Sequence, residues 1–314
     1  MFASLLTKRS LATLIKGQDA AKKIMSQVSQ DLELLQKAGV KPKVVPVVVG
    51  NVAESRIYLD RKRAAALKAG LEFEEKIIPD TVDMPTMLKT IQDLNADPSV
   101  HGIIVQLPIP KHLDEQVVCN SVDVTKDVDG FTCRNLGNLV QGVGLGDSFV
   151  PCTPLAALKI LQQIQQTEGI DFMGKNAVVA GRSHNVGLPI AMILQADHIK
   201  GGLDLTTTIC HRYTPNEQLV EAVSKADVVV SAAGVPGLIK PEFVKPGAIV
   251  IDVGINRIKV DGKAKIVGDV HPDVANVAGH MTPVPGGVGP CTVACLLYNT
   301  VIAARRQSQI WNDF

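Results

Sequence analysis

The chain has 314 residues, of which 46% are hydrophobic and 20% charged, and this composition excludes a disordered chain. Its 32 Lys and Arg against 31 Asp and Glu leave a formal net charge of +1, so the whole chain has no electrostatic attraction toward nucleic acid or an anionic membrane. Aromatic residues make up only 4%, which disfavours base-stacking surfaces. We therefore expect two domains or one large α/β unit, with neither nucleic acid nor a membrane as partner.

Two features of the sequence bear on the cell compartment. Residues 1–18 contain basic and hydroxylated side chains, and the first acidic residue is Asp19. This pattern predicts a mitochondrial presequence over residues 1–11, with a short frayed tail as the alternative. The six cysteines form no CxxC pair, which favours reduced thiols and disfavours a zinc site. We expect the mitochondrial matrix, with the cytoplasm as the alternative.

The first half of the chain alternates helices and strands. Ile24, Val28 and Leu32 recur at helical spacing and predict a helix over residues 19–38, which Gly39 ends. The β-branched runs that follow are typical of buried strands, so the order indicates a parallel sheet with right-handed crossovers. The further elements expected here are a strand at 43–50, a helix at 54–69, a strand at 74–78, a helix at 84–94 and a strand at 102–107.

A second alternation begins after a helix expected at 155–166. Its short β-branched strands and intervening helices indicate a Rossmann-type, doubly wound parallel sheet. The fold class predicted is therefore α/β with two domains. The elements expected here are strands at 176–180, 205–210, 227–231 and 248–253, helices at 186–194 and 217–225, and a last helix at 292–304.

A glycine-containing loop joins the first strand of this second block to a helix. Gly181 and Gly187 lie where backbone N–H groups at a helix start would hold a pyrophosphate. The spacing differs from GxGxxG, and an ordinary turn is the alternative. The next strand ends at Arg212 instead of the acid that usually binds ribose. Arg182 and Arg212 together predict a 2′-phosphate, hence NADP, unless Arg212 is a solvated surface residue.

Polar residues share one face of the helix expected at 54–69. Ser55, Tyr58 and Lys62 lie at i, i+3 and i+7. A single helical lysine is usually solvated, but here Tyr58 offers a ring and a hydroxyl beside it. Gln106, at the carboxyl end of a strand, is placed to hydrogen-bond the amine. A partly desolvated Lys62 could then shuttle protons.

Two loops carry unusual residue patterns. Asp127 and Asp129 in KDVDGF could be a metal pair, a turn, or an anchor for a donor-rich heterocycle. The segment PVPGGVGP at 283–290 combines rigid prolines with permissive glycines, which suits a loop around a flat ligand.

Together these segments resemble the methylenetetrahydrofolate dehydrogenase/cyclohydrolase family, over about residues 12–304. The segments that carry the resemblance are SRIYLDRK (55–62), VQLPIP (105–110), KDVDGF (126–131), PCTP (151–154), GRSHNVGLP (181–189), DVGIN (252–256) and TPVPGGVGP (282–290).

The resemblance implies a folate-binding catalytic domain at 12–154, to which a C-terminal helix at 285–314 returns, and a Rossmann-type domain at 155–284. It implies a homodimer and a substrate site between the domains. The implied activity is oxidation of 5,10-methylenetetrahydrofolate to 5,10-methenyltetrahydrofolate by hydride transfer to a nicotinamide cofactor, followed by hydrolysis to 10-formyltetrahydrofolate. Two remote alternatives are an enzyme that forms a Schiff base on Lys62 and a non-catalytic nucleotide-binding protein.

The resemblance also implies roles for individual residues. Tyr58 would stack on the aminobenzoate part of the folate, and Lys62 would transfer protons, paired with Gln106 and supported by Ser55. Asp129 would anchor the pterin ring. Further substrate contacts would be Val105, Leu107, Pro285, Gly286, Gly287, Val288 and Gly289, and cofactor contacts would be Gly181, Arg182, Ser183, Val186, Gly187, Arg212 and Ile255.

The residues after the strand at 205–210 are similar to the mitochondrial NAD-using branch, whose members hold inorganic phosphate and Mg²⁺ beside the adenosine ribose. Arg182 and Arg212 match the two phosphate-binding arginines of that branch. Asp204 matches one metal-binding acid, but the other falls near Gly142, which leaves Asp147 as a nearby candidate. We therefore expect NAD as the preferred cofactor, with NADP as the alternative, and Mg²⁺ and inorganic phosphate as candidate ligands.

Overall fold

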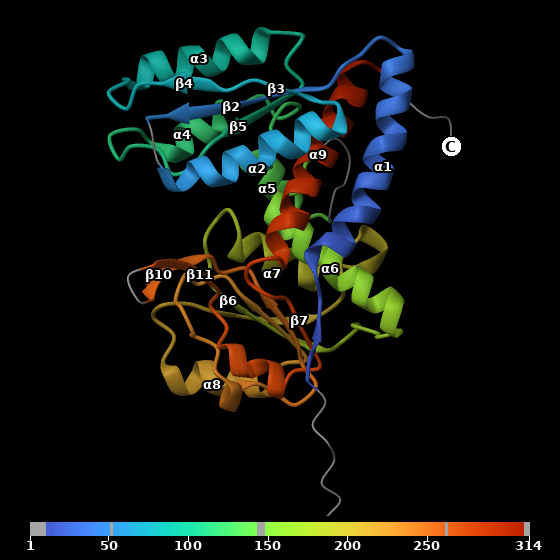
Figure 1. Cartoon of the computed structure of the whole chain (residues 1–314), viewed down its shortest axis with the longest axis vertical. Helices are drawn as coiled ribbons and strands as arrows, with labels where there is room; N and C mark the ends of the chain where they lie inside the picture. Colours follow the sequence, from blue (N-terminus) through green and yellow to red (C-terminus); the bar gives the residue numbers. More distant parts are fainter. Residues whose placement is uncertain (1–10, 51–52, 143–147, 261–262, 311–314) are drawn as a thin grey trace, which may run out of the picture. The chain divides into compact units, whose positions relative to one another are not determined.

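The computed structural model describes the chain except residues 1–10, 51–52, 143–147, 261–262 and 311–314 (Figure 1). The expected presequence therefore lies almost entirely outside the described residues. The chain divides into two compact units: one contains the residues up to Asp19 and Ala157–Pro290, and the other Ala20–Ala156 and Cys291–Phe314. We call them the nucleotide unit and the folate unit, after the ligands expected for each. The fold class predicted from the sequence, α/β with parallel sheets in two domains, is confirmed.

The folate unit is built on a parallel sheet whose central strand is β2 (Lys43–Val49). On one side β2 pairs with β3 (Glu72–Phe73) and β4 (Lys76–Ile78), and on the other with β5 (Gly102–Val105). Alternate residues of β2 belong to a core with Met87 and Ile91. In Figure 1 the helices α3 and α2 lie on opposite sides of these strands. The helices are α1 (Gly17–Lys37), α2 (Ala53–Ala69), α3 (Met84–Ala96), α4 (Glu115–Asn120) and α5 (Cys133–Asn138).

The nucleotide unit holds a six-stranded parallel sheet with the order β1-β12-β9-β8-β6-β7. The order of the strands reverses at β6, because β7 pairs on one side of it and β8 on the other. Ligands of open α/β sheets bind at the carboxyl ends of the strands at such a switch point. The strands are β1 (Thr13–Leu14), β6 (Asn176–Ala180), β7 (Thr206–Cys210), β8 (Val228–Ser231), β9 (Ile249–Asp252) and β12 (His280–Met281). The helices are α6 (Cys152–Glu168), whose residues up to Ala156 belong to the folate unit, α7 (Gly187–Gln195) and α8 (Asn216–Lys225).

The unit boundaries differ from those expected at two places, and one is the segment 285–290, which was expected to return to the folate domain but belongs to the nucleotide unit. The folate domain was expected to begin at residue 12, but the segment up to Asp19 belongs to the nucleotide unit. The reason is backbone pairing: Thr13 and Leu14 form a parallel ladder with β12. The antiparallel hairpin of β10 (Asn256–Val260) and β11 (Lys263–Val267) was also not predicted.

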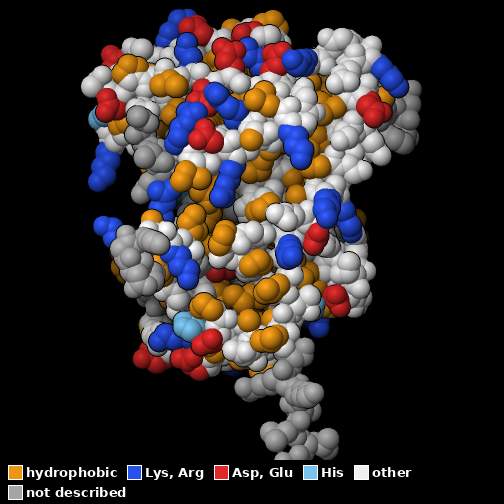
Figure 2. Space-filling model, in the orientation of Figure 1, with side chains coloured by type: hydrophobic (Ala, Val, Ile, Leu, Met, Phe, Trp, Pro, Cys, Tyr) orange, Lys and Arg blue, Asp and Glu red, His pale blue; other side chains and the backbone are white. Residues whose placement is uncertain are grey.

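The last helix, α9 (Val288–Gln307), is longer than the sequence pattern indicated. It is long and apolar enough, by composition alone, to cross a membrane. However, 61% of its most apolar window is buried inside the protein, as in the core helix of a globular protein. On the face that Figure 2 shows, Lys and Arg side chains lie beside Asp and Glu over the upper part of the view.

Candidate active site

Lys62 and Gln106 meet in the folate unit, as the sequence predicted. Lys62 is half-buried on α2, and its Nζ donates a hydrogen bond to Gln106 Oε1 at 3.4 Å. Gln106 follows β5 directly, and its backbone N–H continues the sheet by donating to Val47 O at 2.9 Å. Its Nε2 donates to Leu107 O at 3.0 Å, which orients the amide so that the oxygen faces the amine. The sheet therefore fixes the acceptor that Lys62 uses.

The other residues predicted on this face are placed around the pair. Tyr58 lies one turn before Lys62 and is half-buried, with the Arg61 guanidinium 5.9 Å from its ring centre. Val105 is buried at the end of β5, and Leu107 is half-buried beside it. Ser55 lies in the first turn of α2, but its side chain is outside the described part of the chain.

The two acids of KDVDGF have different surroundings. Asp127 is buried and accepts hydrogen bonds from the backbone N–H groups of Gly130, Phe131 and Thr132 at 2.8–3.1 Å, and from Asn135 Nδ2 at 2.8 Å. These four hydrogen bonds occupy the acceptor positions of both carboxylate oxygens of Asp127, so a metal pair with Asp129 is not supported. Burial raises the pKa of Asp127, and these hydrogen bonds oppose the rise.

Asp129 is buried at 8% exposure and lies near the thiol of Cys152, because its negative charge contributes to raising the pKa of that thiol. Cys152 Sγ also lies 3.3 Å from Val128 O. Burial raises the pKa of the Cys152 thiol well above its usual range, and the charge of Lys62 acts in the opposite direction. Lys62, Gln106, Asp129 and Cys152 therefore share one neighbourhood, and Cys152 is a site residue that the sequence prediction missed, although PCTP marked its position.

Asn299 on α9 was also missed. Its Nδ2 is buried and donates to Val128 O at 2.9 Å and to Val150 O at 3.1 Å. It thus joins the loop of Asp129 to the segment before Cys152. No motif in the sequence pointed to this role, since an isolated Asn in an apolar helix has no distinctive spacing.

The glycine loop of the nucleotide unit is shaped by close backbone approach. Gly181 has φ +125°, and a Cβ there would lie 2.2 Å from Ala232 O. A Cβ at Gly187 would lie 2.3 Å from Gly181 O. Gly187 N donates to Ser183 Oγ at 3.3 Å, whereas Val186 caps α7 without a side-chain hydrogen bond. Leu188 N also donates to Ser183 O at 3.1 Å, and Pro189 has no N–H, so the first turn of α7 uses its backbone donors within the glycine loop.

A cavity of about 500 Å³ lies beyond the carboxyl ends of β6, β7 and β8, at the switch point of the sheet. Gly181, Arg182, Ser183 and Arg212 line it, so most of the predicted cofactor residues come together. Arg212 is exposed and lies 5.0 Å over the ring of Tyr213. Val186, Gly187 and Ile255 are not among the residues that line this cavity.

Buried carboxylates brace the loops next to this cavity. Asp269 Oδ2 accepts from the backbone N–H groups of Ala233 and Gly234 at 2.7 and 3.0 Å, and Asp269 Oδ1 accepts from Asn256 Nδ2. Asp252 in turn accepts from the backbone N–H groups of Gly254, Asp269 and Val270, each at 3.0 Å. The loops after β8 and β9 are thus held together by two neighbouring acids.

Burial raises the pKa of Asp252 from 3.8 to about 6. The folded protein therefore binds this proton more tightly than the unfolded chain. The stabilisation is complete below about pH 4 and is lost as the pH rises through 6. We expect the stability of the wild type relative to Asp252→Asn to fall by on the order of 3 kcal/mol between pH 4 and 7. Urea unfolding across this range measures the difference, and a difference that does not vary with pH would contradict the assignment.

Asp204, the predicted metal ligand, lies before β7 and contacts His198 Nδ1. With Asp197 these residues bring their ligand atoms within 4.8 Å of one another. Imidazole suits zinc and other transition metals, whereas Mg²⁺ prefers oxygen ligands, so this donor set does not fit Mg²⁺. Gly142 offers no carboxylate, and Asp147 lies outside the described residues.

The predicted substrate loop at 285–289 belongs to the nucleotide unit. Gly286 O accepts from Gly17 N at 3.0 Å, and a Cβ at Gly17 would lie 1.7 Å from Gly287 O. Pro285 is exposed, Gly286 and Gly289 are half-buried, and Gly287 and Val288 are buried. The start of α1 therefore packs directly against this loop.

Known proteins share both units. The tetrahydrofolate dehydrogenase/cyclohydrolase family is matched by its catalytic domain over residues 15–129 and by its NAD(P)-binding domain over residues 151–308. The mitochondrial bifunctional methylenetetrahydrofolate dehydrogenase/cyclohydrolase of Drosophila melanogaster is 45% identical, covering 95% of this chain and 96% of that protein. The bifunctional protein FolD of Moorella thermoacetica is 43% identical, covering 94% and 99%. The structure of a methylenetetrahydrofolate dehydrogenase from Bombyx mori has a TM-score of 0.87 and 39% identity, covering 95% of this chain and 100% of that one.

Proposed function

The chain belongs to the tetrahydrofolate dehydrogenase/cyclohydrolase family, and we propose that it oxidises 5,10-methylenetetrahydrofolate and hydrolyses the resulting 5,10-methenyltetrahydrofolate to 10-formyltetrahydrofolate. The observation that carries the proposal is the cluster of Lys62, Gln106 and Asp129 in the folate unit. An amine, an amide acceptor and a buried carboxylate are the groups needed to move a proton and to bind the donors of a pterin.

The folate unit supplies positioning and proton transfer. A nicotinamide dinucleotide, when bound, accepts the hydride that leaves the bridging methylene carbon. Tyr58 stacks on the aminobenzoate ring, and the carboxylate of Asp129 accepts hydrogen bonds from the pterin. Water then attacks the methenyl carbon, and Lys62 Nζ accepts the first proton that the water loses. The remaining hydroxyl proton passes to N5 as the bond between that carbon and N5 breaks, which leaves the formyl C=O on N10. Val105, Leu107 and the loop at 285–289 are proposed as further contacts of the substrate.

The arginines of the dinucleotide cavity are proposed to bind a phosphate group. Both Arg182 and Arg212 line the cavity, and a guanidinium binds phosphate oxygens in bidentate geometry. The group is either the 2′-phosphate of NADP or inorganic phosphate beside NAD, and we propose NAD as the preferred cofactor. Gly181 and Ser183 are proposed to hold the pyrophosphate, with Val186, Gly187 and Ile255 as further cofactor contacts.

Cofactor choice is tested by initial rates with NAD and with NADP, each with and without phosphate and Mg²⁺. We expect phosphate to raise the NAD-dependent rate, and Arg212→Ala to abolish that stimulation and to weaken phosphate binding by about 10- to 100-fold, as expected for a lost charged hydrogen bond. Because the donor set around Asp204 does not fit Mg²⁺, we expect Asp204→Asn to leave any response of the rate to Mg²⁺ unchanged. A higher rate with NADP in the absence of added ions would overturn the preference for NAD.

We also propose that the protein forms a homodimer and lies in the mitochondrial matrix. Strand β7 is one of the two edge strands of the six-stranded sheet, and its Thr206, Thr208 and Ile209 are exposed. Exposed edge strands favour pairing with another chain, which supports a homodimer through this unit. Relatives named as mitochondrial support the mitochondrial matrix, and import of a fluorescent protein fused to residues 1–18 tests it.

The activity itself is tested on the purified chain. We expect 5,10-methylenetetrahydrofolate to reduce the dinucleotide, and supplied 5,10-methenyltetrahydrofolate to be hydrolysed without any dinucleotide. Absence of both reactions would refute the function. Trapping of substrate on Lys62 by borohydride would favour a Schiff-base enzyme instead.

A further inference from the structure

The helix that carries Tyr58 and Lys62 has few apolar anchors. Among the side chains of α2 that the structure describes, only Leu59 and Ala66 are buried, at 1% and 0% exposure. Ile57 and Leu67 are exposed at 42% and 58%. A helix that packs on a sheet usually buries a continuous apolar stripe, which sets its rotation about its own axis. Other contacts must set that rotation here.

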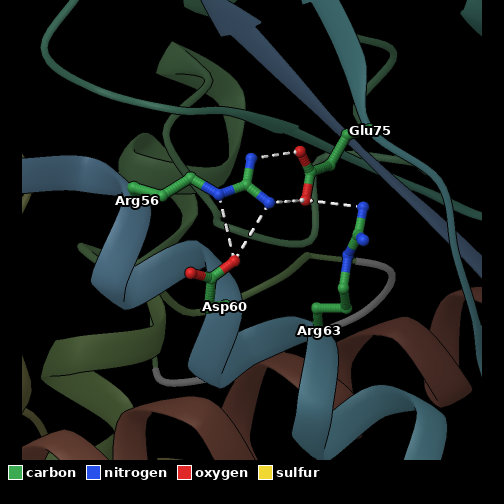
Figure 3. Close-up of polar contacts among 4 residues, drawn as sticks. All are labelled: Arg56, Asp60, Arg63 and Glu75. Carbon is green, nitrogen blue, oxygen red and sulfur yellow. Dashed lines mark hydrogen bonds and ion pairs between the residues drawn. The ribbon is translucent and has the colours of Figure 1, made fainter. Parts of the chain in front are cut away.

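Glu75 provides such contacts, as Figure 3 shows. Its carboxylate accepts from Arg56 Nη1 at 2.6 Å and Nη2 at 3.1 Å, and it forms an ion pair with Arg63 Nη2 at 2.8 Å. The Glu75 side chain is only 4% exposed, so its carboxylate is shielded from solvent in both ion pairs. Arg56 and Arg63 lie two turns apart on one face of α2, and Asp60 pairs with Arg56 between them.

Glu75 and Gln106 are fixed to the same sheet. Glu75 lies between β3 and β4, which both pair with β2, and the preceding Glu74 N donates to Val44 O at 3.2 Å. Gln106 N donates to Val47 O, on the same strand β2. The sheet therefore presents a carboxylate to Arg63 and an amide oxygen to the adjacent residue of the helix, Lys62.

We propose that Glu75 is a positioning residue that sets the rotation of α2 and thereby keeps Lys62 Nζ within reach of Gln106. The proposal rests on the proposed function, in which Lys62 transfers the proton. Neighbouring residues of a helix point about 100° apart, so the same rotation that satisfies Arg63 decides where Lys62 points. The Lys62–Gln106 distance of 3.4 Å is already long for a hydrogen bond, and a small rotation of α2 breaks it.

The test compares Glu75→Gln with Glu74→Gln, a matched change at the neighbouring residue, whose partner Lys43 lies on β2 and not on α2. We expect Glu75→Gln to lower kcat for methenyl hydrolysis by about 10- to 100-fold, as misplacement of a catalytic group by about 1 Å does. The KM for the dinucleotide is expected to stay at the wild-type value, and Glu74→Gln is expected to keep the wild-type kcat.

Arg63→Lys keeps the positive charge beside Glu75 but loses the planar guanidinium. This variant replaces Glu75→Gln in the test if Glu75→Gln does not fold. We expect an intermediate kcat for this variant and for Glu75→Asp. If Glu75→Gln or Arg63→Lys lowers the melting temperature but leaves kcat and the pH–rate profile unchanged well below that temperature, Glu75 is only structural and the proposal is overturned.

Wild type and Lys62→Met are assayed alongside these variants. An inactive wild type would refute the function, whereas an active wild type, an inactive Lys62→Met and fully active Glu75 and Arg63 variants would refute the positioning role alone.

Discussion

Replacing Lys62 with Met is expected to reduce hydrolysis of 5,10-methenyltetrahydrofolate by about 10²- to 10⁴-fold, the range that a positioned acid–base group contributes. Met fills a similar length of the half-buried position but has no amine to take up a proton. Gln106 Oε1 also loses the donor that now lies 3.4 Å away. The effect is expected on kcat, because the proton moves during the reaction and not during binding.

The KM for the dinucleotide is expected to stay unchanged in Lys62→Met, because the residues that line the dinucleotide cavity belong to the nucleotide unit and Lys62 to the folate unit. Lys68→Met is the matched control, since Lys68 is exposed in the last turn of the same helix. A full rate of hydrolysis in Lys62→Met would refute the role of this amine. An equal loss in both variants would point to damage to α2 instead.

Much of the fold was predictable because its strands are short β-branched runs with helices between them. The strand at Asn176–Ala180 was predicted to the residue, since its apolar run is bounded by Asn176 and by Gly181. The hairpin of β10 and β11 was missed, although its two strands alternate basic and apolar side chains on either side of an Asp-Gly pair, a sequence pattern typical of hairpins. The pairing of Thr13 and Leu14 with β12 depends on a sequence separation that no local pattern reveals.

The candidate site was predictable where spacing along one element brings residues together. Lys62 and Tyr58 share a helix face, and Gln106 ends a strand, so their proximity followed from secondary structure. The different surroundings of Asp127 and Asp129 were not predictable, because one residue of separation puts both acids in the same loop. Only the folded loop shows that the backbone uses Asp127 and that Cys152 lies near Asp129.

Gly181→Ala is expected to impair dinucleotide binding more than any change of the charged residues around it. The new Cβ would lie 2.2 Å from Ala232 O and 2.6 Å from Ala232 C, and both are backbone atoms that cannot turn away. The backbone at φ +125° is also one that side chains of L-residues rarely adopt. Relief requires the end of β6 to move away from the end of β8, and these two ends frame the cavity.

We expect the KM for the dinucleotide to rise by about 100-fold or more in Gly181→Ala, which corresponds to about 3 kcal/mol of lost binding. Methenyl hydrolysis needs no dinucleotide, so a folded Gly181→Ala protein is expected to keep it. Gly237→Ala distinguishes backbone strain from the steric clash. Gly237 also has a positive φ of +67°, but no atom lies within 4 Å of the added Cβ. That variant is expected to lose about 1 kcal/mol of stability from backbone strain and to bind the dinucleotide normally. An unchanged KM in Gly181→Ala would mean that the ends of β6 and β8 separate freely, and the loop would then not be the structural basis of dinucleotide binding.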